Sequence, residues 1–361
     1  MPFSSESGRR SCICCTLTRI TATMGMSRRH TDPTMTDSRV LDLTSGVAMI
    51  VTDLHGDFDL YCRYRDRFLQ LHAWGFAQTL VFCGDLIHSD GPAHEDRSLQ
   101  IVLDVLSLQE RLGSDLVVLL GNHEMPHIYG VTLARGDMDY TPRFEAAMGA
   151  HRAAILALFK RLPFYVRTQA GVMIAHAGAP PLAALPGDWD RLRCFDHDAV
   201  LRQAEERMQP DKIAAAREEY ARIVGSPYDD LARRFLSIAG PDDPRYNDLL
   251  RAVVIGDTPD FNFLWSALFT RNEYEFGEPH YARMVEAFLR VASLDFAEQR
   301  VLVAGHIPTR GRKVVGERQL RLFSGAYDGS IRDASYLLLD VAEPVASPYD
   351  LLDRVHRIHS G

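Results

Sequence analysis

The sequence predicts an α/β fold with a parallel sheet, and three observations support this prediction. Between residues 47 and 120, short apolar runs alternate with segments of helical spacing. Each apolar run stops at polar residues, and a long, mostly polar and helical stretch follows at about 181–260. Strands that alternate with helices in this way are typical of a parallel sheet whose strands are joined by crossover helices.

The first half of the pattern contains three buried strands and two amphipathic helices. Continuous apolar runs predict the strands, and apolar residues that recur every three or four positions predict the helices. In chain order the elements are strand Val47–Val51, helix Tyr61–Trp74, strand Thr79–Cys83, helix Leu99–Leu112 and strand Asp115–Leu120.

The second half is expected to continue the same domain, which we place at residues 44–345. A helix at 142–160 precedes two strands, at 164–168 and 171–178, joined by a turn at Gln169–Gly171. We interpret 181–260 as a mostly helical insertion. A helix at 279–291 then precedes three strands that contain "RVLVAG", "QLRLFSG" and "SYLLLDV", and residues 346–361 are predicted to be a surface tail.

The first 43 residues differ from the rest of the chain. They are rich in Ser, Thr and Arg and lack apolar periodicity, so we expect disorder or an extension upstream of the true start. The segment has no apolar core of the kind a secretory signal needs. Three of the six cysteines lie in "CICC" at 12–15 and the others are scattered, which indicates a reduced, cytoplasmic chain.

Charge and hydropathy exclude several function classes. A net charge of −8 argues against a surface that coats nucleic acid. No apolar stretch approaches the roughly 18 residues that a membrane span requires. We therefore expect no membrane partner and no nucleic-acid partner.

Polar side chains follow five of the predicted strands at the point where each strand ends. Ligands in open parallel sheets bind beyond the carboxyl ends of the strands, so these side chains are expected to converge. They are Asp53, His55, Asp85, Asn122, His123, His176 and His306. The alternative is that they cap helices, as Asp and Asn commonly do, but capping does not account for so many at five strand ends.

The chemistry of this set favours metal binding. Oxygen and nitrogen ligands without cysteine suit divalent Mn, Fe or Zn better than a thiolate-held structural zinc. The set exceeds what a single tetrahedral ion needs, and two ions that share the Asp85 carboxylate account for its size. Two metals about 3.5–4 Å apart suit the hydrolysis of phosphate esters.

The order of the motifs resembles the calcineurin-like metallophosphoesterases. The motifs are D-x-H-G, G-D, G-N-H-E, H-A-G and G-H, and the resemblance spans about Val47 to Val341. "DLHG" and "GNHE" look like the phosphoprotein-phosphatase branch, which includes bacterial Shewanella-like phosphatases and diadenosine-tetraphosphate hydrolases. The resemblance implies a four-layer α/β/β/α sandwich. It also implies that metal-bound hydroxide attacks a phosphomonoester of a phosphorylated protein or small molecule.

The resemblance also implies a role for each matching residue. His123 would protonate the leaving oxygen. The first metal would be held by Asp53, His55 and Asp85, and the second by Asp85, Asn122, His176 and His306. Beside these matching residues, we expect Glu124 to anchor the turn rather than bind metal and Asp90 to support the site, and His88 and His127 either support the site or are mere neighbours of it.

The sequence departs from the branch where phosphate is gripped. His88 and Ser89 stand where the branch has Asp and Arg, and Leu120 stands where eukaryotic-type members have Arg. We expect Arg271 and Arg310 to bind substrate instead. Two other functions stay open, namely hydrolysis of a dinucleoside polyphosphate such as diadenosine tetraphosphate, and a catalytically silent metal-binding scaffold.

Overall fold

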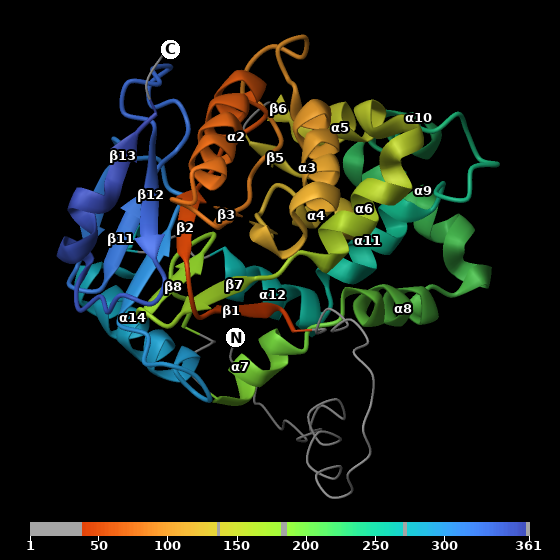
Figure 1. The fold of residues 1–361 in the computed structure, drawn as a ribbon. Coiled ribbons are helices and arrows are strands. Elements are labelled where there is room, and N and C mark those ends of the chain that lie inside the picture. The colour runs from red at the N-terminus through yellow and green to blue at the C-terminus, as the bar shows by residue number, and fades with distance from the viewer. Residues whose placement is uncertain (1–37, 136–137, 182–185, 270–272, 359–361) are drawn as a thin grey trace, which may run out of the picture.

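Two β-sheets lie face to face, with helices on their outer surfaces (Figure 1). The computed structural model describes residues 38–135, 138–181, 186–269 and 273–358. Within these residues the strands form a five-stranded sheet, a six-stranded sheet and a small two-stranded ribbon, β5 (Ala134–Arg135) with β6 (Met138–Asp139). The α/β sandwich expected from the sequence is confirmed.

The five-stranded sheet contains the first strands of the domain. Its order is β13 (Val355–Arg357), β12 (Ser335–Asp340), β2 (Val47–Val51), β3 (Thr79–Phe82) and β4 (Leu116–Val118). Strands β2, β3 and β4 are parallel, as predicted, and β12 is antiparallel to both β2 and β13. The three parallel strands therefore end at the same edge.

The six-stranded sheet is mixed. Its order is β1 (Val40–Leu43), β7 (Tyr165–Thr168), β8 (Val172–Ala175), β9 (Val301–Ala304), β11 (Gln319–Leu322) and β10 (Arg312–Val315). Strands β8 and β9 are parallel, so the residues that follow them also leave the sheet at one edge.

Alternating side chains build the layers, because successive residues of a strand point to opposite faces. In β2, Ala48 and Ile50 join the core between the sheets, whereas Met49 and Val51 pack under the outer helices. Across the inter-sheet core, Ile174 of β8 belongs to the same cluster. These strands are buried on both faces, which explains why they read as continuous apolar runs.

Helices cover both outer faces. On the five-stranded side are α2 (Phe58–Ala73) and α3 (Ser98–Leu112), followed by α4 (Met125–Tyr129), α5 (Tyr140–Met148) and α6 (Arg152–Arg161) (Figure 1). Helix α2 starts where Asp57 accepts a hydrogen bond from the Leu60 N–H, which is an N-cap. On the six-stranded side, α12 (Pro259–Leu268) and α14 (Glu278–Ala292) pack against Tyr165 of β7.

The segment that we interpret as an insertion is helical in its described residues. Its helices are α7 (Pro186–Arg193), α8 (His197–Arg207), α9 (Ile213–Val224), α10 (Tyr228–Leu236) and α11 (Asp248–Gly256), and the short helix α13 (Glu273–Phe276) follows α12. Residues of α10 and α11, with Ile238 and Tyr246 between them, form a small apolar cluster separate from the two larger cores. This part of the chain therefore has packing of its own.

Three boundaries differ from the prediction. The helix expected at 142–160 is two helices, because Gly149 adopts a positive φ of 44° that breaks the first. Val40–Leu43 lie within the segment predicted to be disordered, yet they form β1 and pair with β7. In the predicted surface tail, Val355–Arg357 form β13 and pair with β12. Short edge strands contain too few residues to show the alternation of apolar and polar side chains that marks a strand.

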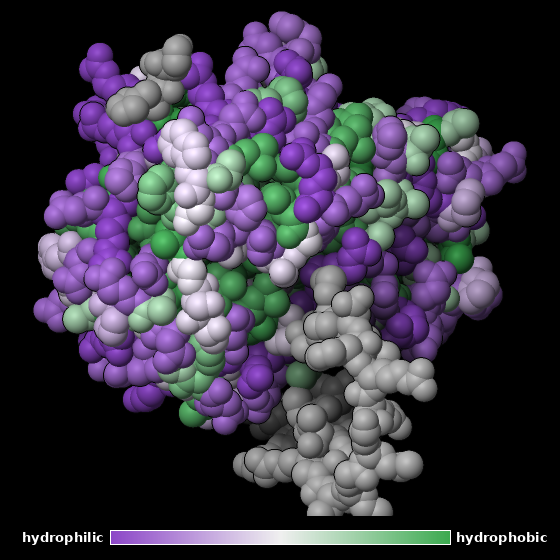
Figure 2. Space-filling view, in the orientation of Figure 1, coloured by the Kyte–Doolittle hydropathy of each residue, from purple (hydrophilic) through white to green (hydrophobic). Residues whose placement is uncertain are grey.

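The face of the molecule drawn in Figure 2 is mostly hydrophilic, with hydrophobic residues gathered in smaller areas between the polar ones. Trp74 and Phe76, just after α2, are among the large apolar side chains that stay exposed, at 59% and 64%. Across the described chain, every helix falls short of the length and hydrophobicity that a membrane crossing requires.

Candidate metal centre

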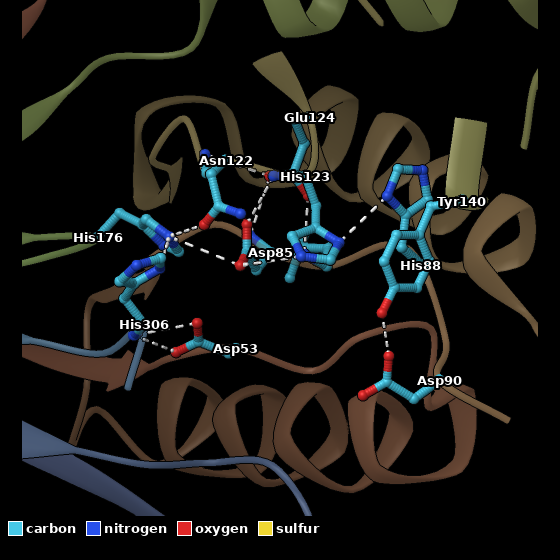
Figure 3. Close-up of polar contacts among 12 residues, drawn as sticks. Asp53, Asp85, His88, Asp90, Asn122, His123, Glu124, Tyr140, His176 and His306 are labelled. Carbon is cyan, nitrogen blue, oxygen red and sulfur yellow. Dashed lines mark hydrogen bonds and ion pairs between the residues drawn. The ribbon is translucent and has the colours of Figure 1, made fainter. Parts of the chain in front are cut away.

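The candidate ligands meet where strands of both sheets end (Figure 3). Asp53, Asp85 and Asn122 follow β2, β3 and β4 of the five-stranded sheet. His176 and His306 follow β8 and β9 of the six-stranded sheet. The parallel pairing within each sheet brings these ends together, so residues that are far apart in the sequence share one site.

Asp85 lies at the centre of the cluster. Its Oδ2 is 3.6 Å from Nε2 of His176 and 3.9 Å from Nε2 of His123. Two groups of side chains have ligand atoms close enough to hold one ion each, and Asp85 belongs to both: His55, Asp85 and His123 form one, and Asp85, His176 and His306 the other. This arrangement gives Asp85 the position of a bridging carboxylate.

Asn122 completes the second group. Nε2 of His176 lies 2.9 Å from Oδ1 of Asn122 and 3.1 Å from Nδ1 of His306. Nδ1 of His176 faces the carbonyl of Cys83 at 2.8 Å. The Cys83 carbonyl accepts only, so Nδ1 of His176 carries the proton and Nε2 is free to act as a ligand. A neutral imidazole held in this way fits a divalent ion.

Asp53 sits beside His306 and is tied to its backbone. Both carboxylate oxygens accept from the His306 N–H, at 3.0 and 2.9 Å. Asp53 therefore links the end of β2 to the end of β9, across the two sheets. It lies outside the two groups of close ligand atoms, and its assignment to the first metal stays a prediction.

The observation that best tests the fit to a metal is an orphaned atom. Nδ1 of His55 is buried and has no hydrogen-bond partner among the described residues. The His55 ring lies 4.7 Å from the ring of His123, and both belong with Asp85 to one group of close ligand atoms. Oxygen and nitrogen donors in this number match a divalent ion of the Mn, Fe and Zn type.

Glu124 supports the site through the backbone. Its Oε2 accepts from the N–H groups of Asp85 at 2.9 Å and Gly121 at 3.2 Å, and its Oε1 accepts from the Leu86 N–H at 2.8 Å. The carboxylate thus clamps the turn after β3 to the turn after β4. Burial raises the pKa of Glu124, and the hydrogen bonds from Asp85 and Leu86 act in the opposite direction.

The site packs too tightly for side chains at two glycines. A Cβ at position 121 would lie 2.3 Å from Oδ1 of Asp85, and one at position 305 would lie 2.2 Å from Oδ2 of Asp53. Three of the candidate ligand residues also carry backbone strain. His55, Asp85 and His306 have positive φ angles of 47°, 52° and 66°, which cost about 1–3 kcal/mol each in non-glycine residues.

Electrostatics favour a cation at this place. Burial raises the pKa of the Asp85 carboxyl well above its usual range, the charges of Glu124 and Asp53 add to the rise, and His55 opposes it. Burial and the surrounding histidines, His55 first, keep the pKa of His123 well below its usual range. A divalent ion would relieve the crowded carboxylates and would bind the neutral imidazoles.

His88 and Asp90 line one side of the site. Both contact Tyr140, a residue that the sequence did not single out. Tyr140, at the start of α5, stacks on the His88 ring at 5.3 Å and 10°, and its hydroxyl donates to Asp90 (Figure 3). Nδ1 of His88 lies 3.1 Å from Nδ1 of His123. Tyr140 follows the G-N-H-E motif on an ordinary helix, so no local signal marked it.

The structure describes one of the two arginines that the sequence predicts to bind substrate. Arg271 lies outside the described residues. Arg310 is exposed, with its guanidinium 5.6 Å from the ring centroid of Tyr327, and no contact among the described residues joins it to the candidate ligands. Leu120, where an arginine was expected, is buried, and its N–H donates to the Pro163 carbonyl at 2.9 Å.

Comparison with known proteins establishes the family. The family described as calcineurin-like phosphoesterase matches residues 47–310, and the chain belongs to this family of metal-dependent hydrolases of phosphoric esters. The resemblance inferred from the motifs is thereby confirmed for the family. No curated protein matches the sequence.

Several solved structures are similar at low identity. One is a protein serine/threonine phosphatase from Saccharomyces cerevisiae with similarity to human phosphatase PP5, 16% identical with a TM-score of 0.45, which covers 84% of this chain and 77% of that chain. Another is the cold-active protein-tyrosine phosphatase of a psychrophilic Shewanella species, 14% identical with a TM-score of 0.40, covering 88% and 82%. With TM-scores below 0.5, these likenesses add nothing to the family assignment, which stands on the sequence match.

Proposed function

We propose that the chain hydrolyses a phosphomonoester of a protein or small molecule at a centre of two divalent ions. The observation that carries this proposal is the position of Asp85, whose carboxylate belongs to both groups of close ligand atoms. Bound divalent ions supply an activated water molecule and neutralise charge on the phosphoryl oxygens.

The residues of the chain have distinct roles in this proposal. Asp53, His55 and Asp85 hold the first ion, and His123 gives a proton to the leaving oxygen. The second ion is held by Asp85, Asn122, His176 and His306. The proximity of His176 to Asn122, His306 and Asp85 supports this second set. The place of His123 supports its role, since its Nε2 lies 3.9 Å from Oδ2 of Asp85 and its side chain is 13% exposed.

Two features bear on cellular context and metal choice. The described cysteines, Cys62, Cys83 and Cys194, are free thiols, which supports a cytoplasmic location. The ligand set has no thiolate, which supports Mn as well as Fe or Zn.

The test compares Asp85→Asn with Asp242→Asn, since Asp242 is an exposed aspartate in the loop before α11. Metal content after dialysis would be measured by mass spectrometry, and turnover of p-nitrophenyl phosphate would be measured in Mn²⁺. We expect Asp85→Asn to lose bound metal and to lower kcat/KM by roughly 10³-fold, about 4 kcal/mol of the barrier. Asp242→Asn should match the wild type.

A wild-type protein that binds metal but turns over no phosphoester would overturn the proposal and leave the metal-binding scaffold, whereas one that binds no metal either would exclude both. A panel of phosphopeptides and dinucleoside polyphosphates, run on the same preparation, identifies the substrate class. Preference for a dinucleoside polyphosphate would replace the phosphomonoester assignment and keep the metal centre.

A further inference from the structure

A row of three histidines runs from the metal centre into the protein interior and ends at a buried carboxylate. Nδ1 of His123 lies 3.1 Å from Nδ1 of His88. Nε2 of His88 lies 2.9 Å from Nε2 of His127, and Nδ1 of His127 lies 3.0 Å from Oε1 of Glu145. His88, His127 and Glu145 are 1%, 1% and 5% exposed, so water does not compete for these bonds.

The carboxylate at the end of the row is a pure acceptor. Oε2 of Glu145 accepts from Nε of Arg152 at 2.8 Å and faces Arg245 at 3.5 Å. Burial alone would raise the pKa of Glu145, but the hydrogen bonds from His127 and Arg152, together with the charge of Arg152, hold its pKa below the usual value. An ionised carboxylate has no proton to give, so Nδ1 of His127 must donate to it.

With the rings of the row neutral, this end point sets the direction of every bond, because a neutral imidazole has one donor nitrogen and one acceptor nitrogen. If Nδ1 of His127 donates, its Nε2 accepts from Nε2 of His88. Nδ1 of His88 then accepts, and Nδ1 of His123 must donate. Burial, the largest cause, also keeps the pKa of His88 well below its usual range, which agrees with a neutral ring at that position.

We propose that Glu145, His127 and His88 are positioning residues that fix His123 as its Nδ1–H tautomer with Nε2 turned to the metal centre. This inference rests on the proposed role of His123 as the acid. The proton delivered to the leaving oxygen then sits on Nε2, on the side that faces Asp85. When that proton leaves, the neutral ring that remains is the tautomer that the row already holds.

The row explains the departure from the branch at His88. A carboxylate at this position accepts from His123 unaided, whereas an imidazole accepts only if its other nitrogen finds an acceptor of its own. His127 and Glu145 provide that acceptor inside the protein. Tyr140 stacks on His88, and the His88 N–H donates to Ser98 Oγ at 2.8 Å, which holds the ring in place despite a positive φ of 71°.

The first arm of the test reads the tautomers directly. Full-length protein labelled with ¹⁵N in histidine would be studied by long-range proton–nitrogen correlation, metal-free and loaded with diamagnetic Zn²⁺, with signals assigned by single His→Gln variants. We expect Nδ1–H for His123 and His127 and Nε2–H for His88. A neutral His123 that carries its proton on Nε2 would overturn the proposal, whether or not the protein has phosphoesterase activity.

The second arm reverses the row with Glu145→Gln. The oxygen of the new amide stays toward Arg152 and Arg245, so its NH₂ group faces His127 and donates to Nδ1. The proton of each of the three histidines should then move to the other ring nitrogen. We expect kcat for p-nitrophenyl phosphate to fall about 10–100-fold with KM within about twofold. Glu219→Gln, an exposed partner of Arg222 on α9, is the matched control and should change neither reading.

The third arm is a rescue. In the double variant His88→Asp with Glu145→Gln, the new carboxylate accepts from His123 directly, so kcat should recover most of the loss and the Nδ1–H signal of His123 should return. Unchanged tautomers and kcat in Glu145→Gln would overturn the proposal. If no variant and no wild-type sample turns over a phosphoester, the proposed function fails. The tautomer measurement still decides whether the row holds His123 as its Nδ1–H tautomer.

Discussion

Replacement of Glu124 tests whether one carboxylate holds together the two turns that carry candidate metal ligands. The side chain is 1% exposed and accepts three backbone hydrogen bonds, from Asp85, Leu86 and Gly121. Glu124→Gln keeps one oxygen, which can serve the two donors at Oε2, and places an NH₂ group against the Leu86 N–H. Glu124→Ala leaves all three donors without an acceptor.

The expected cost follows from this count. A buried donor left unsatisfied costs about 1–3 kcal/mol, so Glu124→Gln should lower the free energy of unfolding by about 1–3 kcal/mol. Glu124→Ala should lower it by about 3–9 kcal/mol, which is comparable to the ~5–15 kcal/mol that holds a typical domain together. The ratio between the two variants is therefore the sharper prediction.

Urea unfolding of the metal-free protein, followed by circular dichroism, measures both costs. Glu206→Gln and Glu206→Ala, at an exposed position of α8, are the matched controls and should stay within about 0.5 kcal/mol of the wild type. Equal losses for Glu124→Gln and Glu124→Ala would refute the count of three separate bonds. Wild-type midpoints for both would show that Glu124 does not clamp the turns.

Two further predictions concern packing and pH. Gly121→Ala places a Cβ 2.3 Å from Oδ1 of Asp85, so calorimetry should show metal affinity at least tenfold weaker, whereas Gly187→Ala, which meets nothing within 4 Å, should bind like the wild type. Equal affinities would contradict the steric argument. Burial, with Arg39 and Lys160 nearby, keeps the pKa of His197 well below its usual range. Below about pH 6.5, His197 is therefore protonated in the unfolded chain while it stays neutral in the folded protein. Stability should therefore rise with pH up to about 6.5 and level off above, with a smaller rise in His197→Phe. Urea midpoints between pH 5 and 8 measure this, and an equal rise in both proteins would rule it out.

Much of the sandwich could be predicted because its central strands are buried on both faces. Val47–Val51 and Thr79–Phe82 appear as apolar runs for that reason, and their bounds agree with the prediction within a residue. Edge strands gave no such signal. Lys313 and Arg312 of β10 are exposed, and β1 and β13 are each only a few residues long, so pairing with a neighbouring strand decides their conformation.

The convergence of the candidate site was predictable for a related reason. Asp85 and Asn122 directly follow strands, and the direction of a strand fixes where its end lies. Tyr140 and Glu145 lie on α5, far along the chain from the residues they support, and nothing in their local sequence distinguishes them from core residues. Only the packing of α5 beside the G-N-H-E turn gives them a role.

The span of the ligand set has a consequence during protein synthesis. Asp53 and His306 touch in the folded protein but are 253 residues apart in the chain. At about 5–20 residues per second, a ribosome adds His306 roughly 10–50 s after Asp53. Late in that interval the nascent chain already contains Asp53, Asp85, Asn122 and His176, but it still lacks His306. The complete set exists only after most of the protein has been made, so a truncated product could not acquire the full centre.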